Sequence, residues 1–199
     1  MEIILPNTEM VTKARVYDLE ECVKASGYPM MAVINDNPLT EKDWKRAERL
    51  SYNPPGTAHN NHLKGISIHF DLTATNKLWI EAERYSYFVP VACQSTMHRL
   101  CNMDLDACCS DHVDSKMIEL LKEFQQQYNE TKAKEDYLRL LYNCPSGIKL
   151  TGRITTNYSQ LKTIYQQRRN HRLPEWQTFC DWIETLPYSE WITKNEIPR

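Results

Sequence analysis

The segment from Ile66 to Leu72 constrains the fold of this chain more than any other. Its apolar and polar residues alternate strictly, in the order Ile66, Ser67, Ile68, His69, Phe70, Asp71 and Leu72. A period of two is typical of a β-strand with one buried face and one face toward water or a ligand. We therefore expect a sheet that is covered on one side and polar on the other.

Helical patterns surround this strand. Thr40-Glu-Lys-Asp43 resembles a capping box that opens a helix through Leu50, and the cluster Asn53–Gly56 ends it in a loop. Further helices are expected over residues 76–87, 117–128, 135–141, 158–169 and 175–186, with 148–156 either extended or opening the next helix. A chain of 199 residues, 41% of them hydrophobic, predicts a single α+β domain over residues 1–199. Its antiparallel or mixed sheet should be flanked by several helices, with the tail beyond Pro187 peripheral.

Composition excludes several classes of protein. No stretch has the apolar length needed to span a bilayer, and the first ten residues lack a signal-peptide pattern. The seven cysteines are odd in number and show no C-x-x-C spacing, which indicates reduced, mostly buried thiols. His59, His62 and His69 lack a carboxylate or cysteine to complete a metal pattern. We expect a cytoplasmic protein without a membrane partner and without a metal.

The formal charge of −2 hides two windows that contain no acid. One runs from Lys149 to Pro174 and contains Lys149, Arg153, Lys162, Arg168, Arg169 and Arg172. The other runs from Arg84 to Met103 and contains Arg84, His98 and Arg99. Two positive windows favour one composite site for a phosphate or carboxylate. The alternative is two solvated basic faces that nearby acids balance.

The stretch Thr155–Glu175 is predicted to be a helix whose far end presents an arginine cluster to an anion. Arg168 lies four residues after Ile164 and seven after Leu161, so it continues the buried stripe of this helix. A buried arginine needs a partner. That partner is either a ligand or an internal carboxylate such as Glu175.

The second window contains Gln94-Ser-Thr-Met-His-Arg99. Hydroxyl groups beside backbone N–H groups, followed by an arginine, suit a phosphate cradle, and a simple helix cap is the alternative. The chain has no P-loop, no G-x-G-x-x-G and no Ser-His-Asp pattern, so ordinary kinase or hydrolase chemistry has no support.

These residues together resemble the flavin-dependent thymidylate synthases. The chain reads T-x-N-x-x-x-L-x-x-x-x-x-x-R and then H-x-x-x-E, formed by Thr155, Asn157, Leu161, Arg168, His171 and Glu175. The resemblance covers residues 53–183 and is strongest from Arg139 onward. It implies a thymidylate synthase-like part at 53–183, with residues 1–52 as an N-terminal extension packed on it.

The resemblance implies a homotetramer with active sites between subunits. It also implies transfer of a one-carbon unit to C5 of dUMP, with FAD as cofactor and methylenetetrahydrofolate and NADPH as co-substrates. Arg168 would hold the pyrimidine as the catalytic residue, and Arg139 would reach the nucleotide of a neighbouring subunit. The remaining dUMP contacts would be Gln94, Ser95, Thr96, Met97, His98 and Arg99. The FAD contacts would be His62, Arg84, Asn157, Thr163 and His171.

The chain departs from the family pattern on the flavin side. Only Arg84 stands in the region of the family's Arg-His-Arg triplet, and Ser159 replaces an arginine two residues beyond Asn157. Two other functions therefore remain open. One is a nucleotide-binding homologue without flavin redox activity. The other is a nucleic-acid-binding protein, whose affinity would fall steeply with salt.

Overall fold

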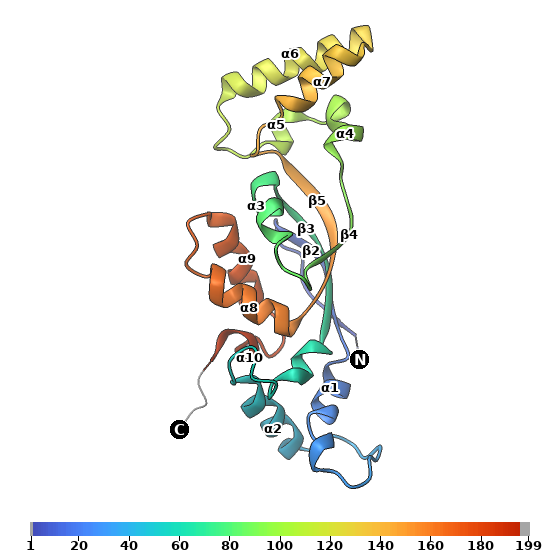
Figure 1. The fold of residues 1–199 in the computed structure, drawn as a ribbon, viewed down its shortest axis with the longest axis vertical. Helices are drawn as coiled ribbons and strands as arrows, with labels where there is room; N and C mark the ends of the chain where they lie inside the picture. The colour runs from blue at the N-terminus through green and yellow to red at the C-terminus, as the bar shows by residue number, and fades with distance from the viewer. Residues whose placement is uncertain (1, 196–199) are drawn as a thin grey trace.

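A computed structural model describes residues 2–195, and its centre is a five-stranded antiparallel sheet. The strands are β1 (Ile3–Ile4), β2 (Val11–Tyr17), β3 (Ser67–Thr75), β4 (Val89–Cys93) and β5 (Lys149–Asn157). Their spatial order is β1-β2-β3-β5-β4. The strand expected at 66–72 is confirmed as β3, at the centre of this sheet, and the α+β class is confirmed with it (Figure 1).

Ten α-helices surround the sheet within the described residues. They are α1 (Leu19–Ala25), α2 (Glu41–Ser51), α3 (Asn76–Ala82), α4 (Thr96–Arg99), α5 (Leu105–Cys108), α6 (Ser115–Thr131), α7 (Lys134–Tyr142), α8 (Tyr158–Arg168), α9 (Pro174–Glu184) and α10 (Glu190–Thr193). Three short 3₁₀ helices cover Tyr28–Met30, Asn61–Lys64 and Leu100–Asn102. None of the helices in this part of the chain is long and apolar enough to cross a membrane.

Buried and half-buried residues alternate along β3 and β5, so the sheet has one buried face and one polar face. Ile68, Phe70 and Leu72 of β3 are fully buried, and so is Ile154 of β5. They pack in one core with α8 and α9, which lie on one side of the sheet in Figure 1; Phe70, for example, contacts Trp182 with ring centroids 4.8 Å apart. The residues between them are only half-buried, so the other face of the sheet stays polar.

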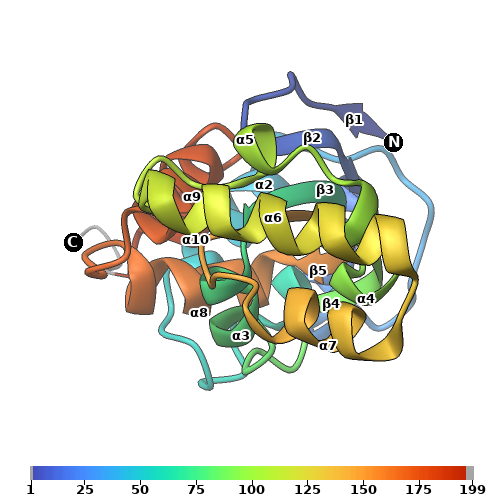
Figure 2. The same cartoon turned by 90° about the horizontal axis from the view of Figure 1, so that it is seen from above.

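A second, smaller core lies at one end of the sheet. It consists of Leu100, Leu105, Leu121, Phe124, Leu140 and Ile148. Helices α6 and α7 pack on each other across this end, as the view from above shows (Figure 2). Helix α4 lies beside them, so this end carries both the 94–99 segment and the helix of Arg139.

Several boundaries differ from the sequence expectation. The single helix expected over Thr155–Glu175 is wrong, because β5 continues through Asn157 and the chain leaves the helix between Arg168 and Pro174. The separate helices expected over 158–169 and 175–186 are confirmed as α8 and α9. The helix expected over 76–87 ends at Ala82. The tail beyond Pro187 is not peripheral, because α10 buries Trp191 and Ile192 in the main core.

Three further expectations concern the capping box of α2, the cysteines and the division of the chain at residue 53. The capping box of α2 is confirmed, since the backbone N–H of Thr40 donates to Asp43 Oδ2 over 2.9 Å. All seven cysteines are free thiols, but only Cys109 and Cys180 are buried. The division of the chain at residue 53 stays a prediction. Residues before it supply β1 and β2, which are hydrogen-bonded into the sheet.

His62 is buried next to the C-terminal end of α2. The Ser51 hydroxyl donates to the Ala47 carbonyl, so its oxygen accepts from His62 Nε2 over 2.9 Å. Burial lowers the pKa of His62 from 6.5 to about 4, and the nearby cations Arg46 and Lys162 also lower it. The neutral imidazole is therefore the form that fits the fold.

This burial predicts a loss of stability in acid. An unfolded histidine takes up its proton near pH 6.5, whereas the folded chain resists it until about pH 4. The contribution of His62 is therefore complete above pH 6.5 and is lost as the pH falls to about 4, at a cost of about 3 kcal/mol. Urea unfolding at a series of pH values measures it. His62→Gln should flatten this part of the profile, whereas the exposed His59→Gln should leave it unchanged; equal slopes in both variants would contradict the assignment.

Candidate functional site

A polar groove opens between α8 and the turn that follows α3. It has a volume of about 560 Å³. Its lining consists of Arg84, Tyr85, Ser86, Gln160, Thr163, Gln167 and Arg168. The two contributing segments are more than seventy residues apart in the sequence, and the central sheet brings them together.

The helical period of α8 places its lining residues on the side that faces the groove. Gln160, Thr163 and Gln167 are spaced by three and four residues, so they share one face of the helix. Tyr158, Leu161 and Ile164 are fully buried on the core side. Asn157 is the N-cap of α8, because its side-chain oxygen accepts from the Gln160 backbone N–H over 2.8 Å.

Glu81 of α3 organises the inner end of the groove. Its Oε2 accepts from Arg168 Nη1 over 3.0 Å and from the Trp176 indole over 2.9 Å, and His171 Nε2 lies 3.6 Å away. Its Oε1 lies 3.1 Å from Lys77 Nζ. Burial alone would raise the pKa of Glu81, but hydrogen bonds from Trp176 and Lys77 hold it below its ordinary value. Glu81 is thus an ionised carboxylate that fixes the position of Arg168.

The internal partner expected for Arg168 exists, but it is Glu81 and not Glu175. Glu175 instead accepts from the backbone N–H of Thr75 over 2.8 Å. The Arg168 guanidinium also lies 4.9 Å from the Trp176 ring centre, and its side chain is 12% exposed. Arg168 is therefore held in place on one edge, and its remaining Nη2 group has no protein partner among the described residues.

A chain of hydrogen bonds fixes which atoms face the groove. Arg168 Nε donates to the Tyr85 hydroxyl over 2.7 Å, so that hydroxyl must donate its own proton to Gln167 Oε1, 3.0 Å away. Gln160 Oε1 accepts from the Tyr87 backbone N–H over 3.2 Å. The oxygen of each glutamine amide is therefore engaged within the chain, and neither NH₂ group has a protein partner among the described residues. With Arg84, which forms no ion pair in the described part of the chain, they make a groove rich in donors.

The structure gathers only part of the flavin set expected from the resemblance. Arg84 and Thr163 line the groove with Arg168. His171 reaches Glu81 at its inner end, and Asn157 caps the helix that forms its wall. His62 is elsewhere: its imidazole is enclosed and hydrogen-bonded to Ser51, so it offers no accessible edge to a ligand in this arrangement.

The expected phosphate loop, residues 94–99, follows β4 at the end of the sheet that carries α6 and α7. Gln94 continues the pairing of β4, because its side-chain oxygen accepts from the Thr151 backbone N–H over 2.8 Å. Residues 96–99 form α4, which the Tyr137 hydroxyl joins to α7 through the Met97 carbonyl over 3.0 Å. Arg139 of α7 lies over the Phe124 ring, 4.3 Å from its centre. Helices α4 and α7 thus lie together at one end of the molecule (Figure 1), and none of their residues lines the groove of Arg168.

The cations of the two charge windows lie at one site only in part. Three of them have separate partners elsewhere in the chain. Lys162 is buried among backbone carbonyls, Arg153 pairs with Asp71 on the open face of the sheet, and Arg169 pairs with Asp181 over 2.6 Å. Only Arg84 and Arg168, one from each window, line the same groove.

Four residues that line the groove were not predicted from the sequence: Tyr85, Ser86, Gln160 and Gln167. Glu81, which pairs with Arg168, was not predicted either. The helical spacing of the two glutamines, on a face without apolar residues, was a usable signal. No group of three or more His, Cys, Asp or Glu side chains within residues 2–195 is arranged to hold a metal ion.

Comparison with known proteins identifies the fold. No protein-family model matches this chain, and no curated protein matches it in sequence. Two solved structures of flavin-dependent thymidylate synthase from Helicobacter pylori, both with FAD and dUMP, are each 14% identical with a TM-score of 0.71. They cover 92% and 89% of this chain and are themselves covered to 97% and 93%.

A third solved structure is a UMP/dUMP methylase from Streptomyces cacaoi bound to 5-bromo-dUMP. It is also 14% identical, with a TM-score of 0.63, over 94% of this chain and 97% of the methylase. The fold of this chain is thus that of the flavin-dependent thymidylate synthases, over almost the whole length of both proteins.

Proposed function

We propose that this protein is a divergent flavin-dependent thymidylate synthase-like enzyme, which binds a pyrimidine nucleotide and modifies its C5 position. The observation that carries this proposal is the convergence of Arg84, Thr163 and Arg168 on one donor-rich groove in a protein of this fold. The solved structures with the same fold include two with dUMP and one with 5-bromo-dUMP.

The donor-rich groove suits the acceptor atoms of a uracil ring. Uracil has two carbonyl oxygens, and the free Arg168 Nη2 and the two glutamine NH₂ groups are donors of the right kind. A cation beside these oxygens stabilises negative charge on the ring, which increases the electron density at C5. Arg168 would thus both orient the pyrimidine and activate the carbon that is modified.

The phosphate would be bound by a different copy of the chain. Helix α4, which holds residues 96–99, and helix α7, which holds Arg139, lie at the end of the sheet that carries α6, and none of their residues lines the groove of Arg168. We therefore expect that one chain does not bring both halves to one nucleotide. An assembly in which the α4–α7 end of one subunit meets the groove of another would do so. The homotetramer implied by the family resemblance is the form that we propose.

The flavin side of the proposal rests on Arg84, Thr163, Asn157 and His171, which lie in or beside the groove. FAD, when bound, would pass a hydride from NADPH and so reduce the carbon unit from methylenetetrahydrofolate. Arg84, which forms no ion pair in the described part of the chain, would be the cation for its phosphates or for the flavin ring oxygens.

Release of tritium from C5 tests the proposed reaction. The protein is incubated with dUMP that carries tritium at C5, together with FAD, methylenetetrahydrofolate and NADPH. Substitution at C5 replaces the hydrogen there, so the enzyme should release tritium into water, and leaving out the folate should stop product formation. If no tritium is released while dUMP still binds, the second function applies, a nucleotide-binding homologue without redox activity.

A further inference from the structure

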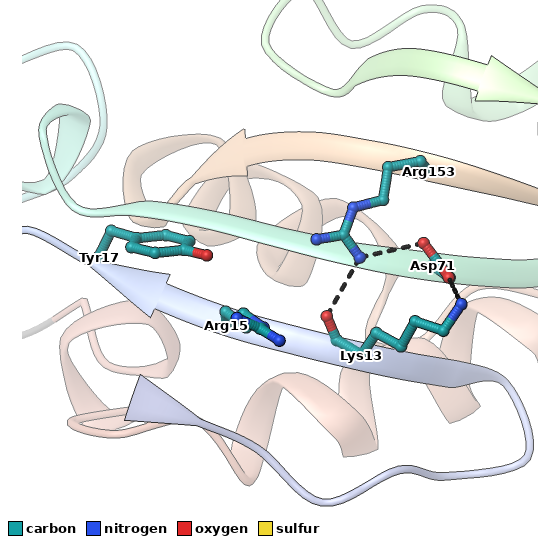
Figure 3. A pocket seen from close by; sticks show the side chains of 5 residues that line it. All are labelled: Lys13, Arg15, Tyr17, Asp71 and Arg153. Atoms are coloured by element: carbon teal, nitrogen blue, oxygen red, sulfur yellow. Dashed lines mark hydrogen bonds and ion pairs between the residues drawn. The ribbon is translucent and has the colours of Figure 1, made fainter. Parts of the chain in front are cut away.

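The open face of the sheet carries a second hollow that the proposed function does not use. It has a volume of about 320 Å³ and is lined by Lys13, Arg15, Tyr17, Asp71 and Arg153 (Figure 3). Strands β2, β3 and β5 each contribute to it. Three cations and one acid therefore meet on a surface that no helix of the described chain covers.

A β-bulge in β2 builds this hollow. The pairing with β3 shifts between Thr12 and Arg15, and Lys13 takes up a left-handed backbone conformation with φ of 51°. Val11 and Val16 are both buried although they are five positions apart, an odd spacing that places two residues on opposite faces of a regular strand. The bulge thus keeps the valines inside and turns Arg15 and Tyr17 outward.

Two contacts hold the bulge in its unusual conformation. Asn7 Oδ1 accepts from the Lys13 backbone N–H over 2.8 Å, and Arg153 Nη1 donates to the Lys13 carbonyl over 3.1 Å. A left-handed conformation at a residue other than glycine costs about 1 kcal/mol. Such bulges occur often next to sites where a side chain must be re-aimed.

Asp71, the acidic residue that lines the hollow, already pairs with two of the cations. Asp71 accepts from Arg153 Nη1 and from Lys13 Nζ, each over 3.0 Å. Burial would raise the pKa of Asp71, but these two cations hold it below its ordinary value. Arg153 keeps its Nε and Nη2 groups without a protein partner in the described residues. Figure 3 shows its guanidinium between Tyr17 and Asp71, and Arg15, Tyr17 and Arg153 line one hollow.

A carboxylate near the start of the chain already contacts two of the residues that line the hollow. Glu2 Oε1 accepts from Arg15 Nη1 over 2.6 Å and from the Tyr17 hydroxyl over 3.3 Å. Glu2 precedes a strand of only two residues, and its side chain is 40% exposed. It shows which contacts an oxygen anion makes here, and its own hold on the site is weak.

We propose that Arg15, Tyr17 and Arg153 form a binding site for a phosphate group on the open face of the sheet, and that Glu2 occupies this site at rest. An incoming phosphate displaces the Glu2 carboxylate from Arg15 and the Tyr17 hydroxyl. It then gains the free donors of Arg153, which a carboxylate held by β1 does not reach. This site is separate from the groove of Arg168 and does not depend on the proposed enzymatic function.

Titration of the isotope-labelled protein with inorganic phosphate tests this site by NMR. The Nε–H signals of Arg15 and Arg153 should shift together and saturate. Glu2→Gln removes the competing carboxylate and should tighten binding about two- to fivefold, as expected for loss of one exposed ion pair. Arg15→Met should abolish the saturable shift of Arg153.

Matched variants and a second ligand sharpen this test. Glu41→Gln removes an exposed acid that is also paired with a cation, and it should leave the phosphate affinity unchanged. If phosphate shifts neither arginine, or if Glu2→Gln and Glu41→Gln behave alike, the proposal is overturned. A repeat with dUMP on the Arg168→Ala variant identifies the source. Shifts of Arg15 and Arg153 there support the phosphate of a nucleotide, and shifts with inorganic phosphate alone support a free ion.

Discussion

Lys162→Met is expected to lower the free energy of unfolding by about 3 kcal/mol. The Lys162 side chain is fully buried, and its Nζ donates to three backbone carbonyls, those of Ser51 (2.6 Å), Trp191 (3.1 Å) and Lys194 (2.7 Å). Burial lowers its pKa to about 8, so the ammonium keeps its three protons at neutral pH. Three N–H groups meet three acceptors, and methionine of similar length leaves all three carbonyls unsatisfied.

The loss should appear as a fall in melting temperature of about 6–12 °C. It should also appear as early proteolysis after α9, because Lys162 ties α10 and the end of α2 to α8. Lys45→Met is the matched control, since Lys45 forms only an exposed pair with Glu41. If both methionine variants melt at the same temperature, the three carbonyl contacts of Lys162 do not stabilise the fold.

Arg168→Ala is expected to weaken dUMP binding by about 10- to 150-fold, the effect of losing one charge-assisted contact worth 1.5–3 kcal/mol. Its Nη2 group is the free cationic donor at the inner end of the groove, and Glu81 and Tyr85 hold it there. Arg168→Lys keeps the charge without the forked geometry, so its loss should be intermediate. Calorimetric titration with dUMP measures all three proteins.

Arg169→Ala supplies the control for this experiment. Arg169 is the next residue in the chain, but it points to Asp181 and Glu184 on α9, away from the groove lining. It should bind dUMP as the unmodified protein does. An affinity that falls equally in both alanine variants would mean that the general positive charge of this region, and not the position of Arg168, attracts the nucleotide.

The sequence was sufficient where one period ran through a whole element. Strand β3 alternates without interruption, and α2 has both its capping box and its helical period. Strand β2 gave no such pattern, because the bulge at Lys13 shifts the alternation between Val11 and Val16. Strand β4 gave none either, since all five of its residues are exposed at the edge of the sheet.

The same limits explain the errors around Arg168. Thr155 was taken into a helix, but Ile154 and Thr156 are buried while Thr155 is not, so this stretch follows the period of a strand. Asn157 then accepts from the Gln160 backbone N–H, and α8 starts at Tyr158, where the helix expected over 158–169 begins. The carboxylate that holds Arg168 lies 87 residues earlier, in α3. No local pattern signals a contact of that sequence separation.

What sequence did supply was the direction of Arg168. Its place on the buried stripe of α8 required an inward guanidinium with a partner, and the structure has both. The family resemblance named Arg84, Thr163 and Arg168 without placing them together, and the fold brings them to one groove. The amide orientations of Gln160 and Gln167 could come only from the hydrogen bonds of the folded chain.

The side-chain amide signals of Gln160 and Gln167 test the central claim most directly. Both residues line the groove, and their NH₂ groups have no protein partner among the described residues. Addition of dUMP to the isotope-labelled protein should therefore shift both amide signals and saturate, and Arg168→Ala should require far more dUMP for the same shift. The amide of Gln126, which is exposed on α6 and donates to Glu130 over 2.8 Å, should not move. If dUMP binds and leaves Gln160 and Gln167 unmoved, the nucleotide site is not this groove.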